Sequence, residues 1–301
     1  IAQGAVWYCG YFYTRFFMER VLKVDTNTVD QLVLAVTVAS AFLYIFFGWL
    51  SDRVGRKPVM LFGMILALVS FFPGFHALTK AANPALAEAQ AASPVRVIAA
   101  TGECSVQFDP IGKAVFASAC DIAKSVLSNA GVSYTTDVGS IAAGRAIVRI
   151  GSREISSIDG TGMDASALKA ARTEVETRVK AALVAAGYPQ TADPARINMP
   201  LTFLILMLFM VGATALYGPQ AAALVELFPT RVRYTAMSLP YNIGTGWVGG
   251  LLPAASFALV AASGNIYFGL WYSVAFTLVA VIVSLIWLPE TKGRDLNTME
   301  D

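Results

Sequence analysis

Two long apolar runs of the chain meet at residues 48–58, which read GWLSDRVGRKP. The run before this stretch is 32–47 and the run after it is 59–72, and both are almost free of charge. The stretch itself carries one acidic and three basic side chains, Asp52, Arg53, Arg56 and Lys57. A charged loop this short between two membrane-length segments predicts a tight hairpin at the membrane surface. Its cations predict that it faces the cytoplasm, because short cytoplasmic loops are enriched in Lys and Arg.

The composition of the whole chain agrees with a membrane location. The chain has 301 residues, of which 56% are hydrophobic and 14% charged, and its mean hydropathy is +0.60. Soluble domains usually carry about a quarter charged residues. The net charge of +2 gives no indication of a nucleic-acid partner, and the single histidine, His76, argues against a His-rich metal site or a His-dependent triad. We therefore expect a membrane protein with no metal and no cofactor.

Apolar stretches long enough to cross a bilayer, which takes about 20 residues, recur six times. They are 1–22, 29–50, 58–78, 200–225, 234–262 and 266–288. The chain opens at Ile1 in apolar sequence without a signal-peptide pattern, so we expect a fragment that begins inside, or just before, a membrane helix. The sequence thus predicts an all-α polytopic membrane protein with six transmembrane helices.

Charged residues gather between the third and fourth apolar stretches. Residues 80–198 hold twelve of the 22 Lys and Arg residues and eleven of the 20 Asp and Glu residues, which predicts a soluble insert. Its patterns predict a small α+β domain with strands at 96–100 and 104–108, a helix at 116–130, a strand or hairpin at 143–155, and a helix at 164–186 capped by Asp164. The domains predicted are 1–79 (three helices), 80–198 (the insert), 199–290 (three helices) and 291–301 (a cytoplasmic tail).

The charged loop resembles the signature loop of the major facilitator superfamily in the order of Gly48, Asp52, Arg53, Gly55, Arg56 and Lys57. In that family the loop lies between helices two and three and again between eight and nine, and it gates the cytoplasmic side. Residues 226–233 (ELFPTRVR) and 289–294 (PETKGR) resemble sugar-porter-like signatures at the ends of helices ten and twelve. This order implies the C-terminal six-helix half of a twelve-helix carrier, whose partner would be an N-terminal six-helix half.

Further stretches, residues 4–13, 21–25, 227–232 and 238–244, resemble the metabolite:proton symporter branch of the superfamily. The resemblance implies a proton-coupled symporter of a small organic acid or zwitterion such as proline, betaine, citrate, 2-oxoglutarate or shikimate. It covers about 180 residues of the membrane part and leaves out 80–198.

Cations on one side of the predicted membrane set the orientation. Seven cations lie on the side of the first charged loop: Arg53, Arg56, Lys57, Arg231, Arg233, Lys292 and Arg294. Four lie on the opposite side: Arg15, Arg20, Lys23 and Lys80. This places 80–198 on the periplasmic or extracellular side of a bacterial-type inner membrane. There two cysteines favour a disulfide, Cys104–Cys120.

The three inner loops carry complementary charges, which predicts a cytoplasmic latch. Glu226 and Glu290 would face Arg53, Arg56 and Arg233 when the inner side is closed, and opening would break these pairs. The predicted gate comprises Gly48, Asp52, Arg53, Gly55, Arg56, Lys57, Glu226, Arg233 and Glu290.

Substrate sites of carriers lie near the membrane midplane. The polar and amphipathic side chains predicted there are Gln3, Trp7, Tyr8, Tyr11, Arg15, Tyr217, Gln220, Tyr241 and Asn242. Arg15 forms an i,i+4 pair with Glu19, which favours either mutual neutralisation or contact with substrate or protons. The later spans carry no central ionisable residue, so the main titrating carboxylate of a proton-coupled carrier would lie in the N-terminal half.

Two other interpretations compete with a carrier. The chain could be an extracytoplasmic binding or sensing module anchored by helices, or a membrane-bound enzyme with its chemistry in 80–198. The enzyme ranks lowest because that segment has no His, no Ser-nucleophile motif and no phosphate loop. The three matching inner loops favour the carrier, since an anchor does not need them.

Overall fold

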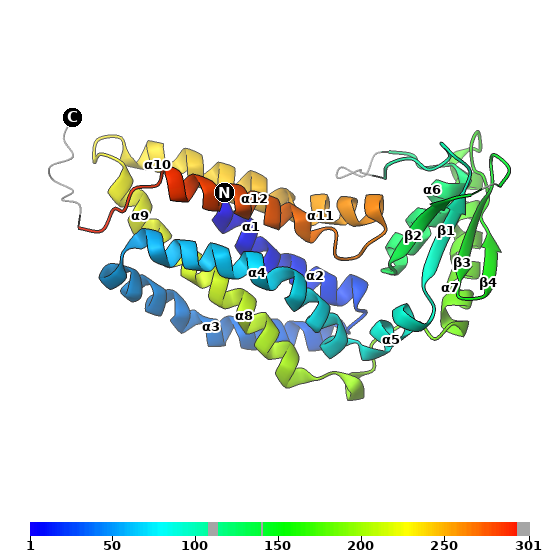
Figure 1. Cartoon of the computed structure of the whole chain (residues 1–301), viewed down its shortest axis with the longest axis horizontal. Coiled ribbons are helices and arrows are strands. Elements are labelled where there is room, and N and C mark those ends of the chain that lie inside the picture. Colours follow the sequence, from blue (N-terminus) through cyan, green and yellow to red (C-terminus); the bar gives the residue numbers. More distant parts are fainter. Residues whose placement is uncertain (108–113, 140, 294–301) are drawn as a thin grey trace.

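A computed structural model describes residues 1–107, 114–139 and 141–293. Most apolar residues lie in helices that run side by side (Figure 1). In the described part, four helical stretches are long and apolar enough to cross a membrane: Thr26–Val54, Arg56–Ala82, Met199–Leu227 and Arg233–Ser263. A fifth apolar helix, α12 (Leu270–Ile286), is shorter. The full set of six spans stays a prediction.

The first predicted span is helical from Ala2 to Val21 but not uniformly α-helical. Two π-helical segments, η1 (Cys9–Tyr13) and η2 (Phe17–Val21), alternate with α1 (Ala2–Tyr8) and α2 (Thr14–Phe16). Segments of this kind occur frequently at functional sites. The sequence did not predict these segments, because a mostly apolar stretch does not distinguish a π-helical turn from an α-helical one.

The remaining membrane helices follow the predicted order. They are α3 (Thr26–Val54), α4 (Arg56–Ala82), α8 (Met199–Tyr217), α9 (Gln220–Leu227), α10 (Arg233–Asn242), η4 (Ile243–Gly249) and α11 (Gly250–Ser263). Small residues let some of them approach closely: a Cβ on Gly63 of α4 would lie 2.7 Å from the carbonyl oxygen of Gly212 in α8. Pro219 separates α8 from α9, because a proline lacks the N–H that a continuous helix needs.

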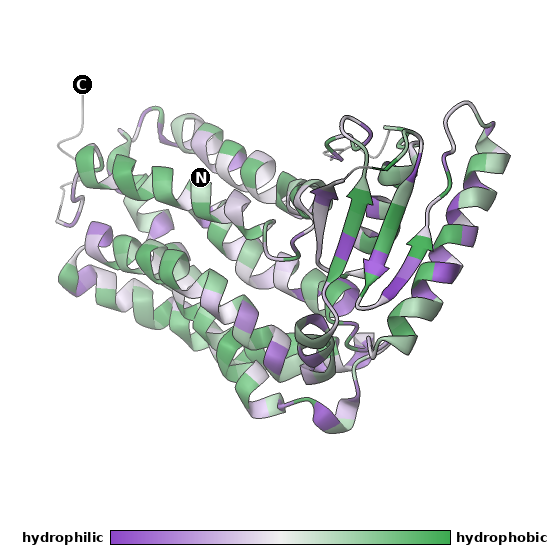
Figure 2. Cartoon of the chain, turned by 45° about the vertical axis from the view of Figure 1, so that its right-hand side comes forward, coloured by the Kyte–Doolittle hydropathy of each residue, from purple (hydrophilic) through white to green (hydrophobic). Residues whose placement is uncertain are grey.

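Residues 95–185 contain a four-stranded sheet with two helices on one face (Figure 2). The strands are β1 (Val95–Ala99), β2 (Tyr134–Val138), β3 (Ala146–Ile150) and β4 (Arg153–Ser156), in the order β2-β1-β3-β4. Strands β1 and β2 are parallel, and the other two pairs are antiparallel. Alternate residues of β1 are buried, and helix α6 (Ala119–Ala130) packs on β1 and β3 while α7 (Ala165–Ala185) packs on β3 and β4. Short helices α5 (Pro84–Ala92) and η3 (Pro194–Arg196) flank this unit.

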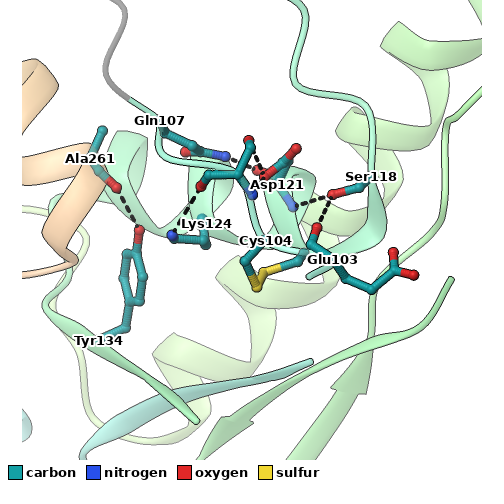
Figure 3. The surroundings of a disulfide bond; sticks show 10 residues. Glu103, Cys104, Gln107, Ser118, Asp121, Lys124, Tyr134 and Ala261 are labelled. Atoms are coloured by element: carbon teal, nitrogen blue, oxygen red, sulfur yellow. Dashed lines mark hydrogen bonds between the residues drawn. A yellow bond between two sulfur atoms is a disulfide. The ribbon is translucent and has the colours of Figure 1, made fainter. Parts of the chain in front are cut away.

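Two details of this segment differ from the sequence prediction. Residues 104–107 form no strand, because Ser105 and Gln107 hydrogen-bond to Asp121 in α6 instead of to the sheet (Figure 3). Strand β2 was not predicted, since its sequence, YTTDV, is mostly polar and it lies at the sheet edge. Phe108 and Arg294 lie outside the described residues.

The two cysteines of the segment form a disulfide, as the sequence predicts. Cys104 and Cys120 have Cα atoms 5.1 Å apart and are linked through their sulfurs (Figure 3). Ser118 caps α6 directly beside them, with its hydroxyl accepting a hydrogen bond from Asp121 N at 3.1 Å. The disulfide therefore anchors the loop before α6 to the first turn of that helix.

Candidate functional site

A cluster of charged side chains lies at the end of the helices remote from the sheet. The α3–α4 turn, the end of α9 and the chain after α12 meet there (Figure 1). Arg56 begins α4, and its guanidinium Nη2 lies 3.0 Å from the Oε1 of Glu226 in α9, while Nε lies 3.3 Å from Oε2. Both side chains are only 13% exposed. Arg56 also pairs with Asp52, one helical turn earlier, which gives it two carboxylate partners.

Glu290 caps the amino terminus of α4. Its Oε1 accepts a hydrogen bond from Arg56 N at 2.9 Å and its Oε2 accepts one from Lys57 N at 3.1 Å. The first N–H groups of a helix have no partner within the helix, and their dipoles favour a negative charge. Partial burial raises the pKa of Glu290, but hydrogen bonds from four backbone N–H groups outweigh burial and hold the pKa below its ordinary value.

Gly55 is required in this arrangement for two reasons. Its φ of 122° is a conformation that residues with a side chain rarely adopt. A Cβ at this position would also lie 2.5 Å from the Oε2 of Glu290. A glycine at position 55 therefore leaves the space in which the Glu290 carboxylate binds the amino terminus of α4.

Thr291 connects the two carboxylates of the cluster. Its hydroxyl donates to Glu226 Oε2 at 2.6 Å, and its backbone N–H donates to Glu290 Oε1 at 2.9 Å. Lys57 Nζ donates to the carbonyl oxygen of Leu285 at 3.2 Å, and Lys292 Nζ donates to that of Arg53. Side chains and backbone together tie the three turns to one another.

Two predicted members of the latch lie elsewhere, which corrects the prediction that they face these carboxylates. The guanidinium of Arg53 stacks over the ring of Trp49 at 4.1 Å, where it has a cation–π contact instead of a carboxylate. Arg233 Nε donates to the carbonyl oxygen of Phe228 at 3.1 Å and closes its own turn. Gly48 makes no contact with these carboxylates: a Cβ added there would meet no atom of the described chain within 4 Å, whereas a Cβ on Gly218 would lie 3.1 Å from the backbone nitrogen of Gly48.

A cavity of about 510 Å³ opens between α1, α4, α9, α10 and α12. Apolar side chains form most of its wall, and its polar lining includes three of the predicted substrate residues, Gln3, Gln220 and Tyr241. Gln3 Oε1 accepts a hydrogen bond from the Thr245 hydroxyl at 2.9 Å. The buried Oε1 of Gln220 has no hydrogen-bond partner in the described part of the chain. An unpaired buried acceptor in an apolar cavity is suited to a ligand that donates a hydrogen bond.

The predicted aromatic residues form a connected group beside this cavity. Trp7 stacks on Tyr11 with ring centroids 5.3 Å apart and donates from Nε1 to the Tyr44 hydroxyl at 3.1 Å. Tyr44 packs edge-on against Tyr217, whose hydroxyl lies 3.4 Å from that of Tyr241. Tyr44 was not among the predicted site residues, although it is the one tyrosine of the stretch 32–47.

Arg15 and Asn242 do not line the cavity. Arg15 Nη2 lies 3.0 Å from Glu19 and 2.8 Å from Asp30, so it holds two carboxylates together. Asp30, the second residue of the predicted span 29–50, was not among the predicted site residues. The Asn242 side-chain nitrogen donates to the carbonyl oxygen of Ser238, on the exposed face of α10. Residues 1–107, 114–139 and 141–293 hold no group of acidic, Cys and His residues that could bind a metal ion.

Long apolar helices, a largely apolar cavity with a few polar groups and a charged cluster at one end agree with a polytopic membrane transporter. A family profile described as sugar (and other) transporter matches residues 113–301, and the profile of the major facilitator superfamily matches residues 2–100. The chain therefore belongs to the major facilitator superfamily and resembles its sugar-porter-like transporters. It is a membrane transporter and not an enzyme.

Curated relatives share short regions with the chain. A glycine betaine/proline/ectoine/pipecolic acid transporter of Dickeya dadantii is 32% identical over 96 residues, which are 32% of this chain and 19% of the relative. An inner membrane metabolite transport protein of Escherichia coli is 36% identical over 98 residues (31% and 20%), and the mouse facilitated glucose transporter member 8 is 30% identical over 112 residues (36% and 23%). The matched region spans about a fifth of each relative's length. No solved structure matches the chain significantly.

Proposed function

We propose that the chain is the C-terminal half of a secondary active transporter and works with an N-terminal six-helix half by alternating access. The observation that carries this proposal is the ion-paired cluster of Arg56, Glu226 and Glu290, which ties three chain turns at one end of the helices. In this proposal the end with the cluster faces the cytoplasm. The segment 80–198 lies on the periplasmic side of a bacterial-type inner membrane.

The cluster acts in this proposal as a latch that favours one state of the carrier. Hydrogen bonds to charged groups contribute about 1.5–3 kcal/mol each, which is comparable with the free-energy difference between two carrier states. Because Arg56 and Glu226 are largely shielded from water, salt screens their pair less than an exposed pair. Loss of either charge would shift the balance between the states.

We infer that the substrate is a small zwitterion or organic acid, carried together with protons. The cavity lined by Gln3, Gln220 and Tyr241 offers neutral polar groups, which suit a ligand with no large net charge. The neighbouring rings of Trp7, Tyr11 and Tyr217 suit a substituted ammonium group, because cations are attracted to aromatic faces. The names of several relatives, which are proline and betaine transporters, favour the same class of substrate.

The test is uptake by the complete carrier in vesicles, with proline and glycine betaine as substrates and external pH as the second variable. We expect uptake to be saturable and accompanied by proton entry, and to fall when Glu226 is replaced by Gln. Uptake that is independent of a proton gradient would remove symport from the proposal.

The orientation has its own test, labelling with an impermeant thiol reagent from the outside of cells. Cysteines placed at exposed Asp52 and Lys292 should be protected, and a cysteine at exposed Ser152 should react. Labelling of Asp52→Cys from outside would contradict the proposed topology.

A further inference from the structure

The segment that carries the sheet is joined to the helix bundle by direct contacts (Figures 1 and 3). Tyr134 N donates to the carbonyl oxygen of Gly264 at 2.7 Å, and the Tyr134 hydroxyl donates to that of Ala261 at 3.0 Å. Gly131 ends α6 and packs against the end of η2, where a Cβ would lie 2.9 Å from the carbonyl oxygen of Arg20. The ends of α6 and β2 therefore rest on η2 and α11.

Two cavities flank this contact. One of about 400 Å³ lies between η2, α6 and α11, and one of about 300 Å³ lies between η2, α6 and α7. Val21, Asn129 and Val132 line both of them. Cavities of these volumes are in the range of small-molecule sites.

The charges that face the two cavities are unbalanced. Arg20, Lys23 and Lys180 supply three cations, and Glu176, which lies 2.5 Å from Lys180, supplies one carboxylate. Arg20 and Lys23 make no ion pair within the part of the chain that the structure describes. Burial, followed by the charges of Lys180 and Arg20, lowers the pKa of Lys23. Exposed Arg20 and half-buried Lys23 thus lie at the edges of these cavities without an ion-pair partner among the described residues.

Lys23 is held at this place by its backbone. Its φ is 57°, and within the described part of the chain it is the one residue other than glycine with a positive φ. Residues with a side chain seldom adopt this conformation, which costs about 1 kcal/mol or more. The carbonyl oxygen of Lys23 accepts a hydrogen bond from Ala192 N at 2.9 Å, so the segment after α7 stabilises the turn that carries this cation.

We propose that the junction between η2, α6 and α11 binds an amphiphilic organic anion. Its carboxylate or phosphate group lies where the two cavities adjoin, between Arg20 of the 400 Å³ cavity and Lys23 of the 300 Å³ cavity. Its apolar body fills the 400 Å³ cavity against Phe257, Val260 and Ile266. The same chemistry is present in a soluble organic acid and in an anionic lipid. This site is separate from the cavity lined by Gln220, and it does not rest on the transport function.

The test is titration calorimetry of the full chain in phosphatidylcholine nanodiscs, with hexanoate as the probe and hexanol and hexylamine as charge controls. We expect saturable binding of hexanoate only. Arg20→Gln should weaken this binding about tenfold or more, which corresponds to about 1.4 kcal/mol. The matched control is Lys169→Gln on the exposed face of α7, remote from both cavities, which should leave the affinity within about twofold.

A second variant keeps the proposal testable if Arg20→Gln fails to fold. Ala254→Leu narrows the apolar cavity and leaves both cations in place, and it should also weaken hexanoate binding. A third arm replaces part of the lipid by phosphatidylglycerol: competition with hexanoate assigns the site to anionic lipid, and unchanged binding assigns it to a soluble acid. Equal binding of hexanoate and hexanol, wild-type affinity in both variants, or no saturable heat would each refute the site.

Discussion

The guanidinium of Arg56 lies 3.0 Å from the carboxylate of Glu226, although 170 positions of sequence separate the two residues. The same arginine offers its backbone N–H to Glu290, which is a further 64 positions along the chain from Glu226. One residue at the start of α4 therefore joins three turns through its side chain and its backbone. The amino terminus of α4 is therefore stabilised by Glu226 from α9 and by Glu290 from the chain after α12.

Neutralising Glu226 is expected to weaken the latch and the helix end together. Glu226→Gln leaves the largely buried guanidinium of Arg56 with Asp52 as its one carboxylate partner among the described residues, and we expect a loss of about 2 kcal/mol in unfolding free energy. Transport should fall as well, and the swap Arg56→Glu with Glu226→Arg should recover part of both. Glu174→Gln, which alters an exposed pair on α7, is the control and should change neither. Unfolding in denaturant and vesicle uptake measure the effects, and full uptake by Glu226→Gln would contradict the latch.

The cap on α4 is expected to weaken in acid. Because the pKa of Glu290 lies below its ordinary value of 4.5, the folded state gains stability from the carboxylate at neutral pH and loses it as pH falls through the folded pKa. The side chain is exposed, so the effect should be under about 1 kcal/mol. We expect wild type to be more stable than Glu290→Gln at neutral pH and the difference to shrink as pH falls below the ordinary pKa of a glutamate. Parallel unfolding curves with a constant offset would show that the cap does not depend on this charge.

Gln220 is expected to separate stability from transport. Its Oε1 is buried and has no hydrogen-bond partner among the described residues. Replacing Gln220 with Leu removes this unsatisfied acceptor and should leave the unfolding free energy unchanged or raised. The same change removes a ligand contact in the 510 Å³ cavity and should raise the uptake KM about tenfold. Asn242→Ala on the exposed face of α10 is the control. Normal KM in Gln220→Leu would exclude this residue from substrate binding.

The disulfide is expected to stabilise the segment that carries the sheet, with little effect on the helix bundle. It closes a loop of 16 positions between Cys104 and Cys120, and a loop of that length corresponds to about 3 kcal/mol. Replacing both residues by Ala should lower the temperature at which the sheet unfolds. Amide hydrogen exchange should rise in α6 and β1 and stay unchanged in α4. Uniform loss of protection across both parts would show that they unfold as one unit.

Local patterns of the sequence were sufficient to locate the charged turns and the long apolar helices at 26–54, 56–82 and 199–227. The apolar run 32–47, the charges of 51–57 and the proline at position 219 act through contacts within a few residues, so a linear reading finds them. The same holds for Asp164, whose carboxylate caps α7 two and three residues further on. Strand β2 was not predicted, because a polar edge strand is stabilised by pairing with its neighbour β1. Each residue of β2 pairs with a residue of β1 that lies 39 positions earlier in the sequence.

The identity of the partners was decided only by the packing of distant segments. From the sequence, Arg53, Arg56 and Arg233 were equally good candidates to pair with the two carboxylates. In the tertiary structure Arg56 forms the ion pair with Glu226, Arg53 stacks on Trp49, and Arg233 binds a carbonyl oxygen of its own turn. It also brought Asp30 to Arg15 and Tyr44 to Trp7. Charge and hydropathy determine which residues lie at a helix end, because those properties are local. Which of them meet depends on how helices far apart in sequence pack, and side-chain geometry at the contact decides it.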